Sequence, residues 1–332
     1  MSTGYQQLVA QMAKRYDVSE EQIGKRVESR RNKLHGLISA HTAARTVATT
    51  LALTAAEQRL GEFLAAGARH VSGVQVTDAL AAARIEAQRG HLSSLGYWPQ
   101  PGESPASIAA HYLRGIEGIG AAGLTCSISV KVDQLGFDRD LCREVLHKAM
   151  QHDVRVHFDA QGFDTVDRTH DLLADGLRLG ADVSGTLPSR WQRSQDDAER
   201  FIELGIAVRV VKGQGGDPDH PKIDPGRAYL ALVERLAGRA AHVGVATHDR
   251  RVAEPALAHL QATHTPCSLE QMRSLPRIDF VALKRGLPVR IYIACGRFGL
   301  PYAIGEFARR PAILGWILRD LLVRGRSSGA RP

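Results

Sequence analysis

Arg209, Lys212 and Gly213 belong to a short segment that has the composition of a buried strand followed by a glycine-rich turn. The segment reads Ala-Val-Arg-Val-Val-Lys-Gly-Gln-Gly-Gly-Asp over residues 207–217. A charged side chain within an apolar strand is unfavourable unless an anionic or strongly dipolar group faces it. Polar residues at the carboxyl end of a strand, followed by backbone that a ligand can approach, are typical of binding edges in parallel α/β proteins. The segment therefore predicts a ligand-binding edge.

Similar polar residues end other β-rich segments of the chain. In a parallel sheet these strand ends would meet on one face. Any one of the residues taken alone is better explained as a structural polar group, but several together favour a shared site. The polar strand ends are Lys131, Asp159, Lys212 with Gly213, Thr247-His248-Asp249, Glu270-Gln271, and Tyr292 with Cys295.

Other catalytic motifs are missing from the sequence or stand in the wrong context. The chain has no G-x-S-x-G elbow, no H-E-x-x-H and no Walker A lysine. A G-x-G-x-x-G pattern occurs at residues 118–123, but it follows a helical pattern and precedes a strand. A dinucleotide fingerprint needs the reverse order, so we interpret these glycines as a helix stop.

The elements that must position the polar residues alternate between β-rich runs and amphipathic helical patterns. Eight such runs predict an α/β fold, a (βα)₈ TIM-like barrel, with a doubly wound sheet as the alternative. Helical patterns fill the gaps, many with an aspartate near the N-cap and a glycine near the end. The β-rich runs are residues 70–74, 126–132, 154–159, 182–187, 208–212, 242–247, 266–271 and 289–293.

The predicted barrel occupies residues 67–323, with further segments at both ends. Residues 1–66 predict a helical arm that could serve as a homo-oligomer element. Residues 301–310 and 313–324 predict two extra C-terminal helices, and residues 324–332 predict a disordered tail.

Composition narrows the class of protein. The 332 residues carry a net charge of +8, which arises from arginines spread along the chain. No basic helix with interleaved aromatic residues occurs, so we expect no nucleic-acid binding. The four cysteines form no C-x-x-C motif, which predicts reduced thiols. The first residues lack the apolar core of a signal peptide and no segment is long enough to span a bilayer, so we expect a cytoplasmic protein.

Taken together and in order, the strand-end motifs resemble the signature of the FAD-dependent proline dehydrogenases, from about residue 69 to 323. Each motif is weak alone, but their order along the chain matches that family. The matching segments are Ser129-Val-Lys131, Phe158-Asp-Ala160, Arg209-Val-Val-Lys-Gly213, Ala246-Thr-His248, Gln271-Met272 and Arg290-Ile-Tyr292.

The resemblance implies an FAD cofactor and a small amine or imino-acid substrate. The family removes a hydride from the carbon beside the amine nitrogen and passes it to flavin N5, which leaves an imine, as in the conversion of proline to pyrroline-5-carboxylate. The implied catalytic residues are Lys131, Asp159, Arg209 and Tyr292. The implied cofactor-binding residues are Arg209, Lys212, Gly213, Thr247, His248 and Gln271.

Several positions depart from the family pattern. Gly305-Glu306 stands where the family has an Arg-Arg pair that holds the substrate carboxylate. A carboxylate there repels another carboxylate, and Arg309 and Arg310 lie one helical turn later. Asp249 replaces an Asn, and Gly215 replaces an aromatic residue. The resemblance therefore predicts the cofactor better than the substrate, which is proline or a related or modified amine.

Two other functions stay open at this point. The first is a non-catalytic barrel that binds a partner or ligand. The second is an aldolase-type barrel in which Lys131 or Lys212 forms a Schiff base. The sequence does not indicate the electron acceptor, which could be a quinone, oxygen or a carrier protein.

Overall fold

The computed structural model describes residues 75–100, 102–160, 162–213 and 216–296, together with Ser19 and Glu21. The predicted N-terminal arm, the predicted C-terminal helices and the tail lie outside this part of the chain. So do Gly215 and the group Glu306, Arg309 and Arg310 that was considered for substrate binding.

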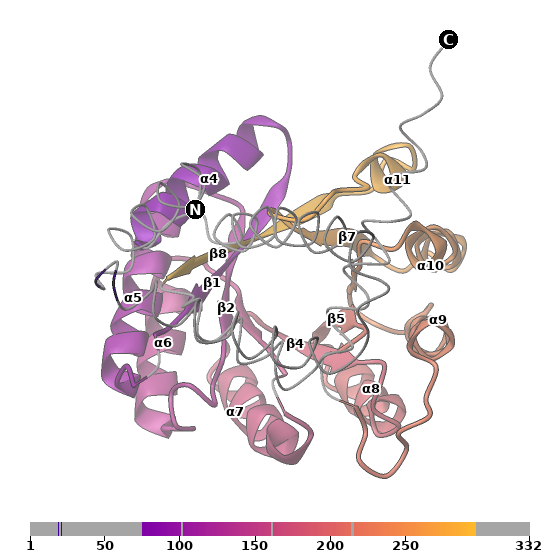
Figure 1. Cartoon of the computed structure of the whole chain (residues 1–332), viewed down its shortest axis with the longest axis horizontal. Coiled ribbons are helices and arrows are strands. Elements are labelled where there is room, and N and C mark those ends of the chain that lie inside the picture. Colours follow the sequence, from indigo (N-terminus) through magenta and orange to yellow (C-terminus); the bar gives the residue numbers. More distant parts are fainter. Residues whose placement is uncertain are drawn as a thin grey trace, which may run out of the picture. The chain divides into compact units, whose positions relative to one another are not determined.

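Eight parallel strands pair in chain order and form a closed barrel (Figure 1). The barrel closes where β1 pairs with β8 over the seven residues from Leu92 to Trp98. This confirms the predicted (βα)₈ architecture, and the doubly wound alternative is wrong. The strands are β1 (Leu92–Trp98), β2 (Cys126–Val130), β3 (Val156–Phe158), β4 (Val183–Pro188), β5 (Ala207–Val211), β6 (Val243–Ala246), β7 (Cys267–Met272) and β8 (Val289–Gly296).

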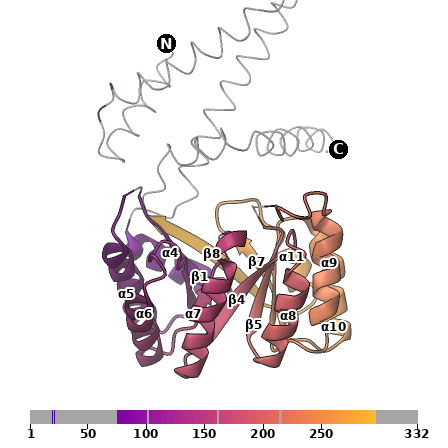
Figure 2. The same ribbon diagram turned by 90° about the horizontal axis from the view of Figure 1, so that it is seen from below.

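Helices surround the strands, as Figures 1 and 2 show. Their ends follow the local sequence signals: Asp138 caps α6, Asp224 caps α9 and Asp249 caps α10 through side-chain hydrogen bonds to backbone N–H groups. The helices are α4 (Val76–Gln88), α5 (Pro105–Ala121), α6 (Arg139–Gln151), α7 (Val166–Arg178), α8 (Ser194–Glu203), α9 (Pro225–Leu236), α10 (Arg250–Ala262) and α11 (Phe280–Leu283), with a 3₁₀ turn at Phe163–Thr165.

The glycine pattern at residues 118–123 ends helix α5, as the sequence indicated. The helix stops at Ala121, and Gly123 has a φ of 58°, a left-handed conformation that suits glycine. Strand β2 begins at Cys126. The pattern is therefore a helix terminus and not a dinucleotide-binding loop.

The first strand differs from the sequence prediction. We expected residues 70–74, which lie outside the described residues, whereas the first strand of the closed barrel is β1 at Leu92–Trp98. This segment contains Ser93 and Ser94, so it lacks the β-branched run that marked the other strands. Its serines are nevertheless buried, at 2% and 0% exposure. A search for apolar runs misses a strand whose inner face packs against polar groups.

The two faces of the barrel wall have opposite chemistry. The residues that face the helices are apolar, such as Leu95, Ile128 and Val210, all of them buried. The lumen instead collects buried polar and charged side chains. These are Ser94, Ser127, Ser129, Lys131, His157, Ser184, Thr186, Arg209 and Glu270. All four cysteines are free and buried. No helix among the described residues is long and apolar enough to cross a membrane.

Gly185 in β4 lies where two helices pack closely against the barrel wall. A Cβ at this position would lie 2.6 Å from Phe201 in α8 and 2.8 Å from Leu173 in α7. We expect Gly185→Ala to lower the free energy of unfolding by about 1–3 kcal/mol, because the added methyl group overpacks the interface. Urea unfolding of the variant and wild type measures this loss in the free energy of unfolding. Gly226→Ala in α9 is the matched control, since a Cβ there meets only Asp224 at 3.4 Å, and an equal loss in both variants would contradict the packing argument.

Candidate active site

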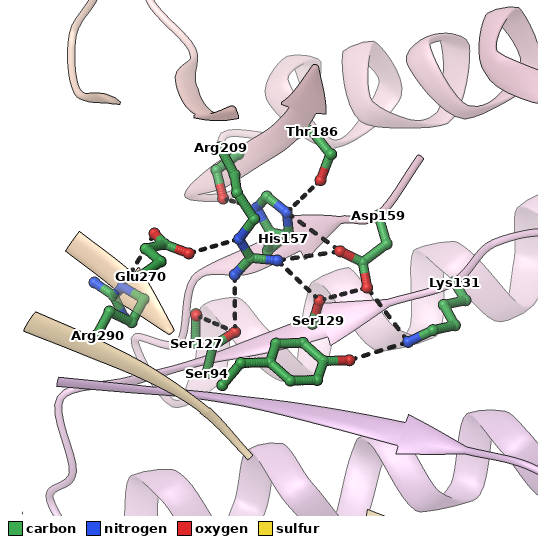
Figure 3. Close-up of polar contacts among 12 residues, drawn as sticks. Ser94, Ser127, Ser129, Lys131, His157, Asp159, Thr186, Arg209, Glu270 and Arg290 are labelled. Carbon is green, nitrogen blue, oxygen red and sulfur yellow. Dashed lines mark hydrogen bonds and ion pairs between the residues drawn. The ribbon is translucent and has the colours of Figure 1, made fainter. Parts of the chain in front are cut away.

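Lys131 and Asp159 face each other at the carboxyl ends of β2 and β3. Lys131 Nζ lies 3.3 Å from Asp159 Oδ2 and donates to the Tyr292 hydroxyl at 3.1 Å. The same Asp159 oxygen accepts a hydrogen bond from Ser129 Oγ at 2.8 Å. Figure 3 shows that Ser129, Lys131 and Asp159 point toward one another from adjacent strands. The carboxylate and the ammonium group are thus held in one fixed arrangement.

Arg209 lies in the middle of this arrangement and explains how β5 tolerates an arginine. Its Nε donates to Glu270 at 2.6 Å and its Nη1 donates to Asp159 Oδ1 at 3.1 Å. Further contacts reach Ser129 at 3.4 Å and Ser94 at 3.2 Å (Figure 3). The protein itself therefore supplies the anions that the sequence required of a ligand. The four predicted catalytic residues, Lys131, Asp159, Arg209 and Tyr292, belong to one connected network.

His157 extends the network below Asp159, and the sequence reading assigned it no role. Its Nε2 lies 2.7 Å from Thr186 Oγ1 and 3.4 Å from Asp159 Oδ1, and its Nδ1 lies 2.8 Å from Ser184 Oγ. The sequence did contain a signal for this position. Side chains alternate between the two faces of a strand, so residues 157 and 159 point to the same face. Glu270 was noted only as a polar strand end, and the structure makes it the partner of Arg209.

Tyr292 depends on a glycine across the barrel seam. A Cβ at Gly96 in β1 would lie 1.9 Å from the Tyr292 hydroxyl oxygen, so only glycine leaves room for this phenol. Trp98 Nε1 donates to the same oxygen at 3.3 Å. Gly96 and Trp98 thus position Tyr292, and both belong to the strand that the sequence analysis did not find.

The electrostatic balance of the network fixes the charge states of its central pair. Burial alone would raise the pKa of Asp159, but Lys131, the hydrogen bond with His157 and Arg209 outweigh it and hold that pKa well below its usual range. Burial alone would lower the pKa of Lys131, whereas Tyr292 and Asp159 raise it above its ordinary value. Asp159 is therefore a carboxylate and Lys131 an ammonium group at neutral pH.

Glu270 and His157 have shifted pKa values for different reasons. Burial would raise the pKa of Glu270, but Arg209 and Arg290 lower it to about 2. Burial, reinforced by the charge of Arg209, lowers the pKa of His157 to about 4. Neutral pH thus leaves Glu270 ionised and His157 uncharged.

Lys212 and Gly213 lie at the rim, directly after β5. Lys212 Nζ pairs with Asp249 Oδ2 at 2.9 Å, and both side chains are partly exposed, at 35% and 41%. Gly213 has a φ of 80°, and a Cβ there would lie 2.9 Å from Pro188. This backbone needs glycine, in accord with the predicted close approach of a ligand. The pairing of Lys212 with Asp249 did not follow from the sequence.

Thr247, His248 and Gln271 form a second group at the ends of β6 and β7. The His248 ring bonds to backbone groups on both sides: Nδ1 lies 2.9 Å from the Pro276 carbonyl, and Nε2 accepts from the Met272 amide at 3.0 Å. Gln271 bonds to the Thr247 carbonyl at 3.2 Å. The resemblance implied that Thr247 and His248 bind the cofactor, and in the structure His248 also fixes the backbone at the end of β7.

The described residues fit a flavin at this end of the barrel. Arg209 has five N–H groups, and its hydrogen bonds to Glu270, Ser129, Asp159 and Ser94 use four of them. One Nη2 hydrogen thus remains for a ligand, counting partners only within the described ranges. The glycine backbone at Gly213 and the cation at Lys212 provide a further place for a phosphorylated cofactor.

Comparisons with known proteins agree with this fold and these motifs. The chain is 25% identical to a proline dehydrogenase of Deinococcus radiodurans over 282 residues, which cover 79% of this chain and 90% of that protein. It is 23% identical to Proline dehydrogenase 1 of Bacillus subtilis over 247 residues, which cover 70% of this chain and 81% of that protein. No protein-family model matches the chain.

Solved structures show the same fold. Proline utilization A (PutA) of Bradyrhizobium japonicum, as its mutant D778Y, superposes with a TM-score of 0.52 at 17% identity. The match covers 62% of this chain and 26% of the PutA chain, so this chain spans about a quarter of that protein. Sequence similarity over most of the chain, together with the closed eight-stranded parallel barrel, supports a divergent member of the proline dehydrogenase family.

Proposed function

We propose that the chain is an FAD-dependent oxidoreductase that transfers a hydride from the carbon beside an amine nitrogen to flavin N5 and releases an imine. The observation that carries the proposal is the convergence of Lys131, Asp159, Arg209 and Tyr292 from four strands on one network. The similarity to proteins named proline dehydrogenase supports it. Bound FAD supplies the hydride acceptor that the side chains themselves lack.

The network suits a neutral amine. A hydride leaves the carbon more readily when the adjacent nitrogen has a free lone pair, so the substrate must enter without its ammonium proton. Asp159 is already engaged by both Lys131 and Arg209, so this carboxylate is not free to pair with a substrate ammonium ion. The Tyr292 ring, near both cations, provides an apolar face for the substrate carbons.

In the proposal, FAD is held by Arg209, Lys212, Gly213, Thr247, His248 and Gln271. Arg209 contributes its remaining N–H group, and Gln271 is buried behind the strand ends at 2% exposure. Asp249 neutralises the charge of Lys212 at the rim. This chain therefore holds a negatively charged cofactor less tightly there than a chain with asparagine at position 249 would. The substrate is proline or a related or modified amine. The electron acceptor, an oligomer formed through residues 1–66 and a cytoplasmic location remain predictions.

The Schiff-base alternative is disfavoured by the same contacts. A lysine must lose its proton before its amine can attack a carbonyl group. Lys131 has a raised pKa beside Asp159 and Tyr292, and Lys212 pairs with Asp249. Neither lysine therefore has the environment of a nucleophile.

We expect Asp249→Asn to bind FAD about three- to fivefold more tightly than wild type, and Lys212→Gln about three- to fivefold less tightly. Asparagine keeps the N-cap that Asp249 provides to α10 while removing the charge opposite Lys212. Flavin fluorescence titration at fixed ionic strength measures both affinities. Arg235→Gln, which removes a surface pair with Glu199, is the control. Failure of wild type to bind FAD at all would favour a non-catalytic barrel.

We expect the free energy of unfolding to fall as the pH decreases from about 6.5 to about 4, in part because of His157. Its pKa is 6.5 in the unfolded chain and about 4 when folded, so the unfolded chain binds the proton first. The contribution is fully present above the unfolded pKa, is lost as the pH falls through this window, and is on the order of 3 kcal/mol. Urea unfolding across the window measures it.

His157→Gln isolates this contribution, because glutamine can still hydrogen-bond with Ser184 and Thr186. His111, His170 and His242 also have lowered pKa values through burial and add to the wild-type slope. The informative quantity is therefore the difference between wild type and the variant. Equal slopes in the two proteins would show that His157 is not held neutral by the fold.

A further inference from the structure

We propose that the floor of the barrel, at the end opposite the candidate active site, binds a monovalent inorganic anion such as chloride. A hollow of about 290 Å³, including the part open to solvent, lies among the amino ends of the strands. Its lining includes Arg155, Arg290, His242, Ser127 and Ser184. These residues begin or precede their strands, whereas the candidate active site occupies the opposite strand ends.

The charges inside the barrel do not cancel. Lys131, Arg209 and Arg290 contribute three positive charges, and Asp159 and Glu270 contribute two negative ones. Their side chains are 6–14% exposed, so water screens them poorly. His157 is uncharged, because burial lowers its pKa to about 4. One positive charge is therefore left over among these buried groups, and a monovalent anion would balance it.

Arg290 carries the unbalanced charge. Glu270 holds Arg209 at 2.6 Å but approaches Arg290 Nε only to 3.7 Å. Arg290 Nη1 donates to the Ser93 carbonyl at 2.8 Å, and its ion pair with Glu270 is longer than the pair that Glu270 forms with Arg209, so one carboxylate serves two guanidinium groups. Burial, together with repulsion from Arg209 and Arg155, lowers the pKa of Arg290. An anion in the hollow would relieve this repulsion.

The other lining groups favour a small anion over a cation. Arg155 places a second guanidinium group at the hollow, oriented by Asp182 at 2.9 Å. Ser127, Ser184 and His242 add polar groups of the kind that surround a bound halide. Glu270 is the one carboxylate in the lining, and Arg209 already engages it. Arg209 also lines the hollow, but Arg155, Arg290, His242, Ser127 and Ser184 have no assigned role in binding FAD or amine, so the chloride response can be tested separately from the proposed function.

Thermal unfolding with and without chloride tests the proposal. Sodium gluconate is replaced stepwise by sodium chloride at constant ionic strength, since gluconate is too bulky for a site of this kind. We expect the Tm of wild type to rise with the logarithm of the chloride concentration once this exceeds the dissociation constant, and by about 3 °C when chloride reaches tenfold its dissociation constant. Arg290→Gln should lose this rise. Arg139→Gln, which removes a surface ion pair with Asp175, should retain the rise in Tm.

Further controls separate the floor from the mouth of the barrel. The chloride response should persist with saturating FAD, and it should weaken in Arg155→Gln, which changes only the outer lining. If Arg290→Gln does not fold, the width of the chloride-35 NMR signal of wild type provides the test. Broadening that bromide reverses and that Arg155→Gln reduces would support the site. An unchanged linewidth, or equal Tm curves in chloride and gluconate, would overturn it.

Discussion

The carboxylate of Asp159, held between Lys131 and Arg209, is the interaction on which the lumen of this barrel depends. An isolated buried charge is costly, so each member of the cluster requires the others. Lys131 lies 3.3 Å from one carboxylate oxygen and Arg209 lies 3.1 Å from the other. Ser129 and His157 complete the hydrogen bonding of the same group. The barrel wall is apolar outside, and this cluster determines what its inside can do.

The same arrangement links stability to chemistry. Arg209 uses most of its donors within the protein, which fixes its orientation before any ligand arrives. Preorganised charges stabilise a reacting group without further rearrangement. Tyr292 gains its position from Gly96 and Trp98, so the seam between β1 and β8 supports the site as directly as the catalytic strands do. Substitutions within this cluster should therefore affect folding and function together.

The sequence predicted the architecture, and it indicated most residues of the buried polar network that forms the candidate site, because the relevant signals are local. β-branched runs ending in polar residues located seven of the eight strands, and the family motifs indicated Lys131, Asp159, Arg209 and Tyr292. The missed strand, β1, has serines where an apolar run was sought, since its neighbours across the lumen are polar. The pairing of Arg209 with Glu270, separated by 61 residues, depends on barrel closure, and no spacing rule shows it.

Anaerobic titration of the purified, FAD-loaded protein with a panel of secondary amines tests the central claim most directly. The panel should include free proline, proline esters and amines that lack a carboxylate. The account predicts that at least one amine bleaches the visible absorbance of the oxidised flavin, and that Asp159→Asn slows this bleaching far more than it weakens FAD binding. A protein that binds FAD while no amine bleaches it would contradict the account, as would equal bleaching rates in wild type and Asp159→Asn.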